Sequence, residues 1–560
     1  MATTLKTYWL QKGINLLSSS ITMKISTILG AVTLLLFCIL WPRLPGQYRM
    51  EPQVAPRAAA SSPLRPHIFF TDVETGPTTG GPGNLGIPIS IFGKGFGATR
   101  GNSRVTIGGT AVASYLVWGS ANAHNKDLDM IVVQPGALRS GGPIEIIVDG
   151  ASSNLDHSFT PTPGHIYYLS PNGSDAHSCS ESSPCATVGH VIPDMKAGDA
   201  LLLRGGAYSE GEIWIRAPQG GAPNQPKTIK NYPGENPVLG NAKRDFYIDA
   251  DYVTVSGLNF QNGKSLLVTG WATLNQRGAR FINNTFSGVI AWAAIDITGH
   301  DHLVAGNVCD LSGSTVGTMG HCYYVTQGTN SKILYNVASG APGYGLHIYD
   351  ERRADKDFQR VISNLLVEGN ILRGSRQRSG MVLDMSDAGN YGNRIENVTI
   401  RNNIFYENDQ AGLVIKGSVR GVSIYSNTFY QNGRQSAYID SNPGINGVDI
   451  RNNLFYQSRD SKCSGECEMT LAHLYVGTNA QHVTVSGNSY CPGRPMIFGV
   501  SDSNPTSGEV SFANADAEDF HLLPGSSAIG HGAVLPVVLT DHDGRPRPSD
   551  HPSDIGAYEY

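Results

Sequence analysis

The stretch NVTIRNNIFYEN (397–408) decides the fold, because it joins an alternating strand to a short phrase that returns along the chain. Apolar and polar residues alternate at its start, an Asn pair follows, and a second short apolar run begins at Ile404. A period of two is the pattern of a half-buried β-strand. The related copies are GLNFQNG (257–263), NNTFSG (283–288), GNVCDLSG (306–313), YNVASG (335–340), GNILRG (369–374), SNTFYQN (426–432), NNLFYQS (452–458) and GNSYCPG (487–493).

One Asn recurs in each copy, at intervals of about 23 to 35 residues. Self-similarity at this period is typical of stacked repeats, in which no single repeat can bury its own apolar face. We expect the Asn at one corner of each coil to hydrogen-bond the backbone of the neighbouring coils, which would satisfy turn groups that are otherwise buried unpaired. The Asn residues are Asn259, Asn284, Asn307, Asn336, Asn370, Asn403, Asn427, Asn453 and Asn488.

The remaining content of each repeat is strand-like. Runs such as VTVSGL, GLHIY, GMVLD and VSIYSN alternate with period two and are bounded by Gly, Asn and Ser. Long amphipathic helix patterns are absent from this stretch, and the L-x-x-L-x-L spacing of leucine-rich repeats is missing. The sequence therefore predicts an all-β protein built mainly as a parallel β-helix, a solenoid of short strands around a narrow packed core.

The totals agree with this fold class and exclude one class of partner. A chain of 560 residues has room for several domains and a sizeable core. Its 66 Gly, 31 Pro and 16% charged residues suit a turn-rich all-β protein. The net charge is −5 and no basic stretch occurs, so nucleic acid is not expected as a partner.

The N-terminus predicts export. Residues 25–41 are uncharged and apolar, and three lysines precede them. Their length is at the lower limit of a membrane span, so they form a transmembrane anchor or the core of a signal peptide. In the anchored form, residues 1–24 stay in the cytoplasm and the chain after Pro42 is exported. Residues 42–66 are rich in Pro and Ala and are expected to be a linker. The protein would then be secreted or held at the cell surface through its N-terminal segment.

The cysteines agree with an oxidising compartment. Cys179 and Cys185 lie close together in the chain, and so do Cys463 and Cys467. Either pair can close a small disulfide loop, and neither has a His or further Cys at zinc-ligand spacing. Three other cysteines are expected to be buried or unpaired: Cys309, Cys322 and Cys491.

Residues 67–161 have the texture of a small β-sandwich, with short strands joined by glycine turns. The phrases GIPISIFGKGFG (86–97) and VTIGGTA (105–111) resemble the IPT/TIG family of immunoglobulin-like domains along the whole segment. In that family the domain is mostly a spacer or interaction module. The resemblance implies no catalytic role here, and no catalytic constellation is seen in this segment.

Residues 165–560 carry a second resemblance. The phrases YLSPNGSD (168–175) and GDALLLRGGAY (198–208) open the segment, and DFHLLPGSSAIGHG (519–532) belongs to its ending. These resemble pectate-lyase-like right-handed parallel β-helix proteins, in which a short N-terminal helix closes the end of the core. The resemblance implies the fold strongly and the activity weakly, since function lives in sites placed on folds.

The strands after each small corner residue can be aligned. In each, the second and fourth residues are apolar or small and should point inward, so the third and fifth should point outward. The aligned strands begin at Ala294, Cys322, Gly345, Gly380, Gly412 and Ser436. The third positions are Asp296, Tyr324, His347, Val382, Val414 and Tyr438, and the fifth are Thr298, Thr326, Tyr349, Asp384, Lys416 and Asp440.

These outward columns suit a groove for an acidic polysaccharide. Neighbouring coils are about 4.8 Å apart, so the columns share one surface. Tyr324 and Tyr438 would stack on sugar faces, and charged groups would orient hydroxyls and carboxylates. The connection 350–378 could wall the groove, although a solvated loop is the alternative for its arginines. These are Arg352, Arg353, Arg373, Arg376 and Arg378.

The leading interpretation is a polysaccharide lyase acting on a uronic-acid polymer. β-Elimination needs a base for the proton α to the carboxylate and a cation that neutralises the carboxylate. Lys416 is the leading base candidate, followed by His347 and Tyr349. An Arg, or Ca²⁺ held by Asp384 and Asp440, would neutralise the carboxylate. Without calcium, two carboxylates beside Lys416 would hold its proton and oppose base catalysis, and the three residues would form a surface salt-bridge row instead.

Two other classes stay open. A glycoside hydrolase would use carboxylates as acid and base, although the paired Asp motif of polygalacturonase-like enzymes is missing. A uronate epimerase would share the lyase's proton abstraction, and the Asp-Pro-His-Asp motif of alginate epimerases is absent. A non-catalytic binding or adhesion protein would present a flat face rather than a walled cleft. The carboxylates available to a hydrolase are Asp296, Asp384, Asp387 and Asp440. The phrase DHDG (541–544) lacks further calcium ligands and is expected to be a turn.

Overall fold

The structure is a computed structural model that describes residues 64–560 with short gaps. The gaps are 120–123, 209, 241–245, 263–266, 270–274, 289–292, 315, 351–360, 387–391, 457–471 and 492–495. The described residues belong to one compact unit, Ser61–Tyr560. Among them, no helix has the length and apolar character needed to cross a bilayer. The predicted anchor at 25–41, Cys463 and Cys467 lie outside the described residues, so these predictions stand as made.

The N-terminal β unit (67–161) consists of two sheets that share an apolar core with residues such as Ile91, Ile131 and Phe159. One sheet has the order β1 (His67–Thr71), β3 (Ile89–Lys94), β7 (Asp129–Gln134), β6 (Ser114–Trp118). The other has the order β2 (Thr75–Gly76), β10 (Ser158–Pro161), β8 (Gly142–Val148), β4 (Arg104–Ile107), β5 (Thr110–Ala111), with β9 (Ala151–Ser152) on β8. The predicted two-layer β texture is present, and the IPT/TIG resemblance remains a prediction.

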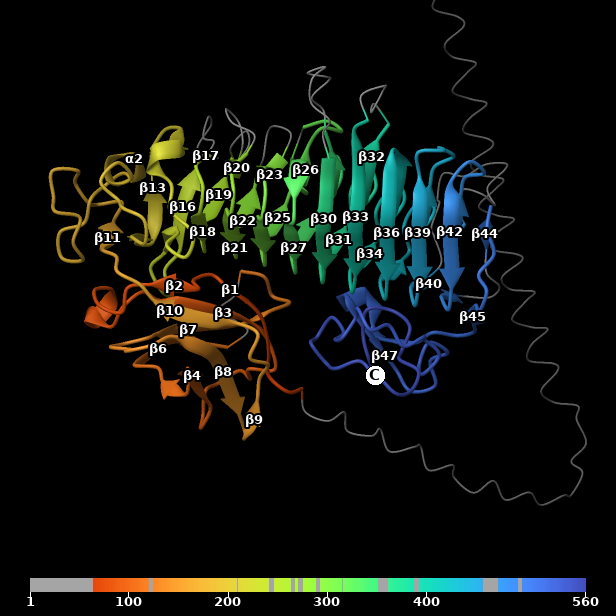
Figure 1. The fold of residues 1–560 in the computed structure, drawn as a ribbon, viewed down its shortest axis with the longest axis horizontal. Helices are drawn as coiled ribbons and strands as arrows, with labels where there is room; N and C mark the ends of the chain where they lie inside the picture. The colour runs from red at the N-terminus through yellow and green to blue at the C-terminus, as the bar shows by residue number, and fades with distance from the viewer. Residues whose placement is uncertain are drawn as a thin grey trace, which may run out of the picture. The chain divides into compact units, whose positions relative to one another are not determined.

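From Ile166 the chain winds into a parallel β-helix, as the repeats predict (Figure 1). Each full coil contributes one strand to each of three sheets, and every strand pairs in parallel with its counterpart in the next coil.

The first sheet contains β11 (Ile166–Leu169), β12 (Ala200–Leu203), β15 (Lys227–Asn231), β18 (Val253–Ser256), β21 (Arg280–Ile282), β24 (Leu303–Ala305), β27 (Lys332–Leu334), β30 (Val361–Glu368), β33 (Arg394–Arg401), β36 (Val419–Tyr425), β39 (Asn446–Arg451) and β42 (Gln481–Ser486). The second sheet contains β13 (Gly206–Tyr208), β16 (Pro237–Gly240), β19 (Asn259–Gln261), β22 (Thr285–Ser287), β25 (Val308–Asp310), β28 (Val337–Ser339), β31 (Ile371–Arg373), β34 (Ile404–Tyr406), β37 (Thr428–Tyr430), β40 (Leu454–Tyr456), β43 (Ser489–Cys491) and β45 (Thr506–Ser507). The third sheet contains β14 (Ile213–Arg216), β17 (Phe246–Asp249), β20 (Leu267–Thr269), β23 (Ala293–Thr298), β26 (His321–Thr329), β29 (Leu346–Tyr349), β32 (Met381–Met385), β35 (Leu413–Gly417), β38 (Ala437–Ile439), β41 (Leu474–Val476) and β44 (Ile497–Phe498).

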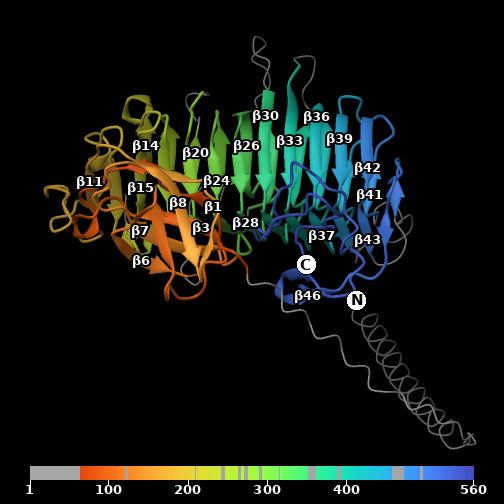
Figure 2. The same cartoon turned by 60° about the horizontal axis from the view of Figure 1, so that its bottom comes forward.

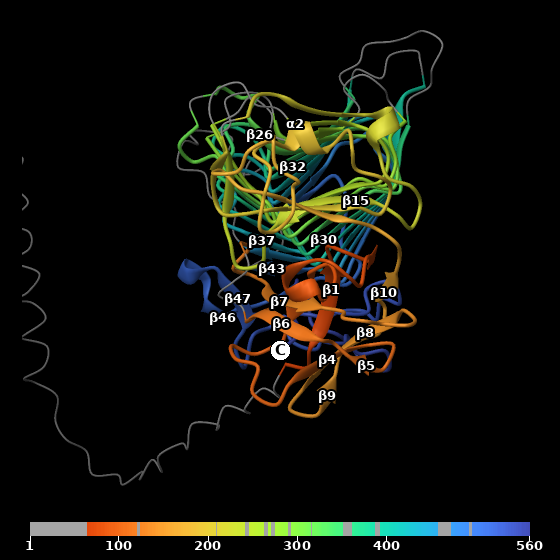
Figure 3. The same ribbon diagram turned by 90° about the vertical axis from the view of Figure 1, so that its left-hand side faces the viewer.

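Side chains that point into the coils form one long apolar core. The end view in Figure 3 looks along the stack, with the strands of successive coils behind one another. Aromatic rings in the second sheet stack from coil to coil, with Phe405 and Phe429 at 4.7 Å and Phe429 and Phe455 at 5.0 Å between centroids. Because each coil must bury its inward face on the next, the stack gains stability only as a whole.

The predicted Asn ladder is present and buried. Each Asn accepts with Oδ1 from the backbone N–H and the side-chain amide of the Asn in the preceding coil. For Asn403 and Asn427 these distances are 2.9 and 3.0 Å. The same pattern runs unbroken from Asn284 through Asn307, Asn336, Asn370, Asn403, Asn427 and Asn453 to Asn488. Since all are at most 1% exposed, the ladder satisfies backbone groups that water cannot reach.

Two details of the ladder were not predicted. Asn259 is not a member, because it pairs with Thr285 in the register and its own coil offers Leu258 at the ladder position. At the other end, Asp502 replaces the next Asn. Its carboxylate accepts from the Nδ2 of Asn488 at 2.8 Å and from the hydroxyl of Tyr490 at 2.8 Å. A carboxylate accepts hydrogen bonds only, so it suits the end of a row of donors.

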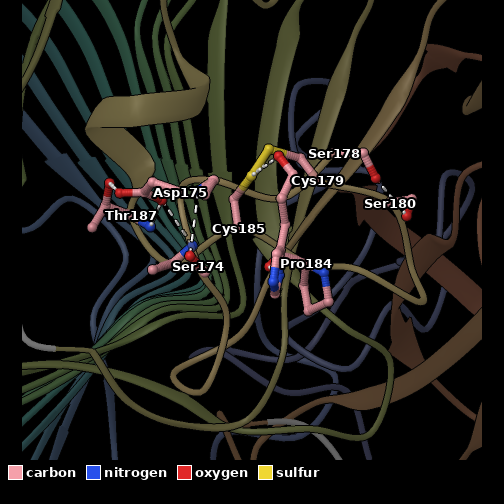
Figure 4. Close-up of a disulfide and its surroundings, with 11 residues drawn as sticks. Ser174, Asp175, Ser178, Cys179, Ser180, Pro184, Cys185 and Thr187 are labelled. Carbon is pink, nitrogen blue, oxygen red and sulfur yellow. Dashed lines mark hydrogen bonds between the residues drawn. A yellow bond between two sulfur atoms is a disulfide. The ribbon is translucent and has the colours of Figure 1, made fainter.

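A polar loop and the single-turn helix α2 (Val188–Val191) lie at the start of the stack, where the cap was expected. Asp175 accepts from the backbone N–H groups of Ala186 and Thr187 and from the Thr187 hydroxyl at 2.8 to 3.0 Å. The predicted disulfide between Cys179 and Cys185 is present beside these bonds (Figure 4). The three-residue 3-10 turns are η1 (Pro82–Asn84), η3 (Ala217–Gln219) and η5 (Ala515–Ala517).

The next two cysteines are buried, as expected, but they are not unpaired. Cys309 and Cys322 form a disulfide. Both are fully buried inward residues, Cys309 on the second sheet and Cys322 on the third, so the loop between them brings them face to face across one corner of the coil. Cys491 is buried and free, as expected.

The N-terminal β unit covers part of the outward face of the first sheet. Phe69, Phe70 and Met130 pack against apolar residues of that face, and the ring of Phe69 stacks on Tyr335 at 3.9 Å. A buried ion pair fixes the contact, since Lys230 Nζ lies 2.6 Å from the carboxylate of Asp72 and both side chains are at most 1% exposed.

The C-terminal tail covers part of the outward face of the second sheet. It contains the hairpin of β46 (Phe512–Asn514), which is labelled in Figure 2, and β47 (Asp519–Leu522). The ring of Phe520 packs against Tyr406 and Tyr430. The DHDG phrase is a turn, as expected, but a buried one. His542 bonds the carbonyl of Asn402 at 2.9 Å and the carboxylate of Asp127 at 2.8 Å, and thereby joins the tail to both other regions.

Candidate functional site

The outward residues of the third sheet stand in the predicted columns. The register pairs Tyr324 with His347, His347 with Val382, Val382 with Val414 and Val414 with Tyr438. The second column pairs Tyr349 with Asp384 and Asp384 with Lys416. We call this surface the third-sheet face.

One part of the second column departs from the prediction. A bulge between Ile297 and Thr298 shifts the register, so that Thr298 pairs with Gln327 rather than with Thr326. Thr298 and Thr326 are buried and hydrogen-bond each other, and Thr326 also bonds Asp296 at 3.4 Å. The outward alternation expected at this coil is therefore lost at the bulge.

Five aromatic rings gather at one end of the third-sheet face. We call them the His347 cluster: His321, Tyr324, Tyr344, His347 and Tyr349. The ring of His347 stacks on Tyr324 at 4.7 Å and on Tyr349 at 5.3 Å, with interplanar angles of 3° and 6°. Because the rings cover one another, the outward residues Tyr324 and His347 are only 3% and 8% exposed. Tyr324 and His347 therefore form a packed wall, and their ring faces are not open to a sugar.

A hydrogen-bond chain fixes the protons of the two histidines. The backbone N–H of Tyr344 donates to Nδ1 of His321 at 2.9 Å, so that nitrogen carries no proton. Neutral His321 then has its proton on Nε2, which lies 3.3 Å from Nδ1 of His347 and donates to it. His347 consequently keeps its own proton on Nε2. It offers a hydrogen-bond donor there and not the lone pair of a base.

Burial and charge keep both rings neutral. Burial, followed by the charge of the nearby Arg378 guanidinium, lowers the pKa of His321 to about 3. Burial, His321 and Arg378 likewise hold the pKa of His347 well below its usual value. The predicted role of His347 as a general base loses support, because a base that binds a proton only in acid is poorly matched to neutral pH.

A hollow opens next to this cluster, where the outward column carries Val382 and Val414 in place of rings. Valine leaves room between the ring walls of Tyr344 and Tyr438, and the result is a pocket of about 260 Å³. We call it the basic pocket. It is lined by Tyr344, Arg378, Ser379, Gln410, Ala411, Val414, Lys416, Arg434, Gln435 and Tyr438.

The three cations of the basic pocket have no carboxylate partner within the described part of the chain. Arg378, Lys416 and Arg434 occur in none of its ion pairs, and no Asp or Glu is among the lining residues. Arg378 instead lies over the ring of Tyr344, with 5.9 Å between its guanidinium carbon and the ring centroid. Unpaired cations in a half-enclosed hollow attract anions more strongly than cations on an open surface do.

Tyr438 forms the far wall. Its ring stacks on Tyr475 of the next coil at 5.1 Å, and its hydroxyl donates to the carboxylate of Asp440 at 3.1 Å. Burial, followed by the charge of Asp440, raises the pKa of Tyr438 to about 12. A protonated tyrosine with a fixed hydroxyl and a flat ring is suited to bind a sugar.

The predicted salt-bridge row is not formed among the described residues. Lys416 lies in register between Asp384 and the coil of Asp440, yet makes no ion pair with either. Asp384 accepts from the backbone and hydroxyl of Ser386, and Asp440 from the backbone of Ser441. The amine of Lys416 is therefore available to a ligand.

The residues present fit a shared calcium ion poorly. Asp384 and Asp440 stand two coils apart, about 9.6 Å between strands, with the cation of Lys416 in the coil between them. Among the described residues they do not fall within a three-group cluster of metal-ligating side chains. Calcium at this site stays a prediction, and no chemical step is derived through it.

The arginines predicted from the connection 350–378 divide in three ways. Arg352, Arg353 and the neighbouring candidate Asp387 lie outside the described residues. Arg376 bonds the backbone carbonyls of Gly340, Leu311 and Ser314 at 2.7 to 3.1 Å, so its guanidinium supports a loop. Arg373 bonds the hydroxyl of Tyr406 on the second sheet. Among the described arginines of this connection, Arg378 alone lines the basic pocket.

Several lining residues were not predicted, because the aligned columns covered only positions after the small corner residue. Gln410 and Arg434 lie two residues before that corner, as the predicted Arg378 does, and Tyr344 and Gln435 lie one before it. The same alignment, extended by two positions toward the N-terminus, would have revealed this row. His321 was missed because nothing in its local sequence indicates that it contacts His347.

Two other places carry less chemistry. A cavity of about 410 Å³ between the N-terminal β unit and the β-helix has a mixed lining that includes four Asn residues, and its Lys230 is already paired with Asp72. His190 lies near Cys179 and Cys185, but sulfurs bonded to each other cannot act as thiolate ligands.

Sequence comparison agrees with the fold. The family model described as right handed beta helix region matches residues 293–490. The uncharacterized protein YwoF of Bacillus subtilis (strain 168) is 30% identical over 108 residues, which are 18% of this chain and 22% of that protein. The match thus spans about a fifth of the relative's length.

Solved structures of similar fold are distant. The pectate lyase Pel9A has a TM-score of 0.44 at 14% identity, covering 71% of this chain and 97% of its own. XylC in complex with xylose has a TM-score of 0.42 at 10% identity, covering 70% and 98%. The alginate lyase from Paenibacillus sp. str. FPU-7 has a TM-score of 0.39 at 13% identity, covering 60% and 99%. These similarities assign no activity to this chain.

Proposed function

We propose that the basic pocket binds an acidic, uronate-containing polysaccharide and cleaves it by β-elimination. The observation that carries the proposal is the set of three unpaired cations, Arg378, Lys416 and Arg434, in a hollow between two tyrosine walls. Tyrosine faces suit sugar rings, and guanidinium groups bind carboxylates with two parallel hydrogen bonds.

The cleavage step uses groups of this chain. An arginine neutralises the uronate carboxylate and makes the adjacent C5 proton more acidic. The unpaired amine of Lys416 in its neutral form takes that proton. The electron pair of the C5–H bond becomes the C4–C5 double bond while the C4–O4 bond breaks, and the leaving oxygen receives a proton from Tyr438 or water. Tyr349 keeps its predicted place on the third-sheet face as an alternative acid or base.

A second candidate is non-catalytic carbohydrate binding, for which the stacked Tyr438 and Tyr475 and the cations suffice. A hydrolase is less well supported, because paired carboxylates are needed and no Asp or Glu lines the described pocket. An epimerase would share the proton abstraction by Lys416 and would differ only in what happens after it.

We extend the proposal to location. The disulfides Cys179–Cys185 and Cys309–Cys322 suit an oxidising compartment, which agrees with export as a secreted or membrane-anchored protein. The polysaccharide partner would then be met outside the cytoplasm, with membrane association through the N-terminal segment.

The test combines binding and product formation by the full chain on a panel of pectate, alginate and glycosaminoglycans. Elimination produces an unsaturated uronate that absorbs ultraviolet light at about 235 nm. We expect Lys416→Met to lower the rate at least about 100-fold with binding largely retained, and Arg378→Gln to weaken binding about tenfold.

Arg420→Gln on the exposed side of β36 is the matched control and should change neither quantity. Binding without product in the wild type would favour the second candidate. Absence of binding to every acidic polymer would overturn the proposal.

A further inference from the structure

Three side chains form a row along one edge of the basic pocket, one from each of three successive coils. Arg378, Gln410 and Arg434 occupy the same place in their coils, two residues before the small corner residue. The backbone keeps them in register, since the N–H of Gln410 donates to the carbonyl of Arg378 at 3.3 Å and the N–H of Arg434 donates to that of Gln410 at 3.2 Å. We call this the corner row. Its order is cation, amide, cation.

The middle member presents an acceptor. The side-chain amide Nε2 of Gln410 donates to the backbone carbonyl of Gln377 at 2.8 Å. Within the described residues Oε1 of Gln410 receives no hydrogen bond, so a neutral acceptor lies in the coil between those of Arg378 and Arg434. At the corner of this coil a carboxylate would face that oxygen's lone pairs, whereas a hydroxyl or amide N–H would donate to it. Lys416 of the same coil lies six residues further along, on β35.

The spacing of the corner row matches a glycan laid along the stack. Coils repeat about every 4.8 Å, which is close to the length of one sugar in an extended chain. Tyr344 lies one coil before Arg378 and Tyr438 lies in the coil of Arg434, so ring walls bound the three coils of the row. A glycan that lay across the stack, parallel to the strands, would contact one member of the row. Its affinity would then not depend on the order of the three residues.

We infer that the basic pocket selects a polysaccharide in which acidic and neutral sugars alternate, bound along the stack with one sugar per coil. Acidic sugars lie at Arg378 and Arg434, and the neutral sugar donates to Gln410. This inference deepens the proposed function, because it rests on polysaccharide binding at this pocket. It does not depend on cleavage.

The test measures the affinity of the full chain, by calorimetry at one ionic strength, for size-matched oligosaccharides. One set alternates uronate with N-acetylhexosamine, as in hyaluronan or chondroitin. The other carries a uronate at every residue, as in oligogalacturonate. We expect the wild type to bind the alternating set at least about tenfold more tightly.

Gln410→Arg makes the row cationic at every coil and should move the affinity ratio about tenfold toward the uniform polyuronate. Gln410→Glu should move the ratio in the opposite direction and weaken both ligands. Gln481→Arg, at an exposed position of the first sheet, is the control for added charge and should leave the ratio unchanged. Thermal unfolding of each variant shows that it is folded before its ratio is interpreted.

The outcomes separate the two proposals. A wild type that binds acidic polymers but prefers the uniform polyuronate overturns the inference and leaves the proposed function standing. An affinity ratio that stays the same in both Gln410 variants also overturns the inference and leaves the proposed function standing. A chain that binds no acidic oligosaccharide overturns both.

Discussion

The second sheet and the third sheet have the same backbone geometry, but their outward faces carry different kinds of residue. On the second sheet, outward residues such as Ile404, Tyr406 and Leu454 are apolar and lie buried under the C-terminal tail. On the third, the outward columns carry rings, cations and carboxylates around a hollow of about 260 Å³. A parallel strand presents every second residue outward regardless of its type. The difference shows that two faces of the same backbone geometry can carry very different residues, apolar ones where the chain's own tail packs and rings and charged groups around the hollow.

The first sheet adds an intermediate case. Its outward face meets the N-terminal β unit through apolar contacts at Phe69 and Tyr335, but also through the buried pair of Lys230 and Asp72. Charge on an outward face therefore does not mark a ligand site by itself. What distinguishes the cations of the basic pocket is that none has a partner carboxylate in the described structure.

The largest expected effect tests the covered first sheet. Lys230→Met would leave the carboxylate of Asp72 buried without its cation, and we expect a loss of about 3 to 5 kcal/mol in the free energy of unfolding. Chemical denaturation measures it. The double variant Lys230→Met with Asp72→Leu should recover much of the loss, and equal losses in both would contradict the stated cause.

The next effect tests the covered second sheet against the open face. Phe520→Ala removes a ring that is 1% exposed and packed on Tyr406 and Tyr430, and should cost about 3 kcal/mol. Tyr438→Ala on the third-sheet face should cost about 1 kcal/mol, because its ring is only half-buried. If denaturation showed the same loss for both, the contrast between the faces would fail.

The pH dependence of stability tests the third-sheet face, where His321 is held neutral. The pKa of His321 is about 3 in the folded chain and near 6.5 when unfolded, so unfolding takes up a proton below about pH 6.5 and stability falls. Relative to the wild type, His321→Gln should gain roughly 2 to 3 kcal/mol on going from about pH 7.5 to about pH 4.5. Denaturant titrations at both pH values measure this, with the exposed His531→Gln as control. A constant difference between variant and wild type would show that His321 is not held neutral.

The smallest effect separates two neighbouring arginines. Arg376→Ala loses hydrogen bonds to three carbonyls and should cost about 1 to 2 kcal/mol while leaving glycan affinity unchanged. Arg378→Gln should do the reverse, with little change in stability and a loss of affinity. Binding and denaturation of both variants test this, and a loss of affinity in Arg376→Ala would restore its predicted place in the groove.

Much of the fold could be predicted because its signals are periodic. The alternation within strands and the Asn of each repeat led to the parallel stack, the ladder and the inward positions such as Leu413 and Ile415. The error at Asn259 was a shift of one residue, where the phrase looks alike but the ladder position holds Leu258. The disulfide between Cys309 and Cys322 was not predicted, because their contact crosses a corner that the alignment of strands does not describe.

The candidate site was predictable only along the strands. Tyr324, His347, Tyr349, Asp384, Lys416 and Tyr438 share the third-sheet face as the columns required. The alignment could not show that His347 is covered by its neighbours, that His321 determines its proton position, or that the hollow lies over Val414. These facts depend on the sizes of side chains that meet across coils.

The sequence by itself determined that this chain is an all-β stack with a buried amide ladder and a fixed set of outward columns, since both features follow from a repeat that each coil contains. The tertiary structure alone decided which outward faces are covered and which cations remain unpaired. The N-terminal β unit and the C-terminal tail approach the coils from more than 100 residues away, as the contacts of Asp127 and Asn402 with His542 illustrate. Such contacts depend on the packing of whole surfaces, so a local sequence pattern cannot predict them.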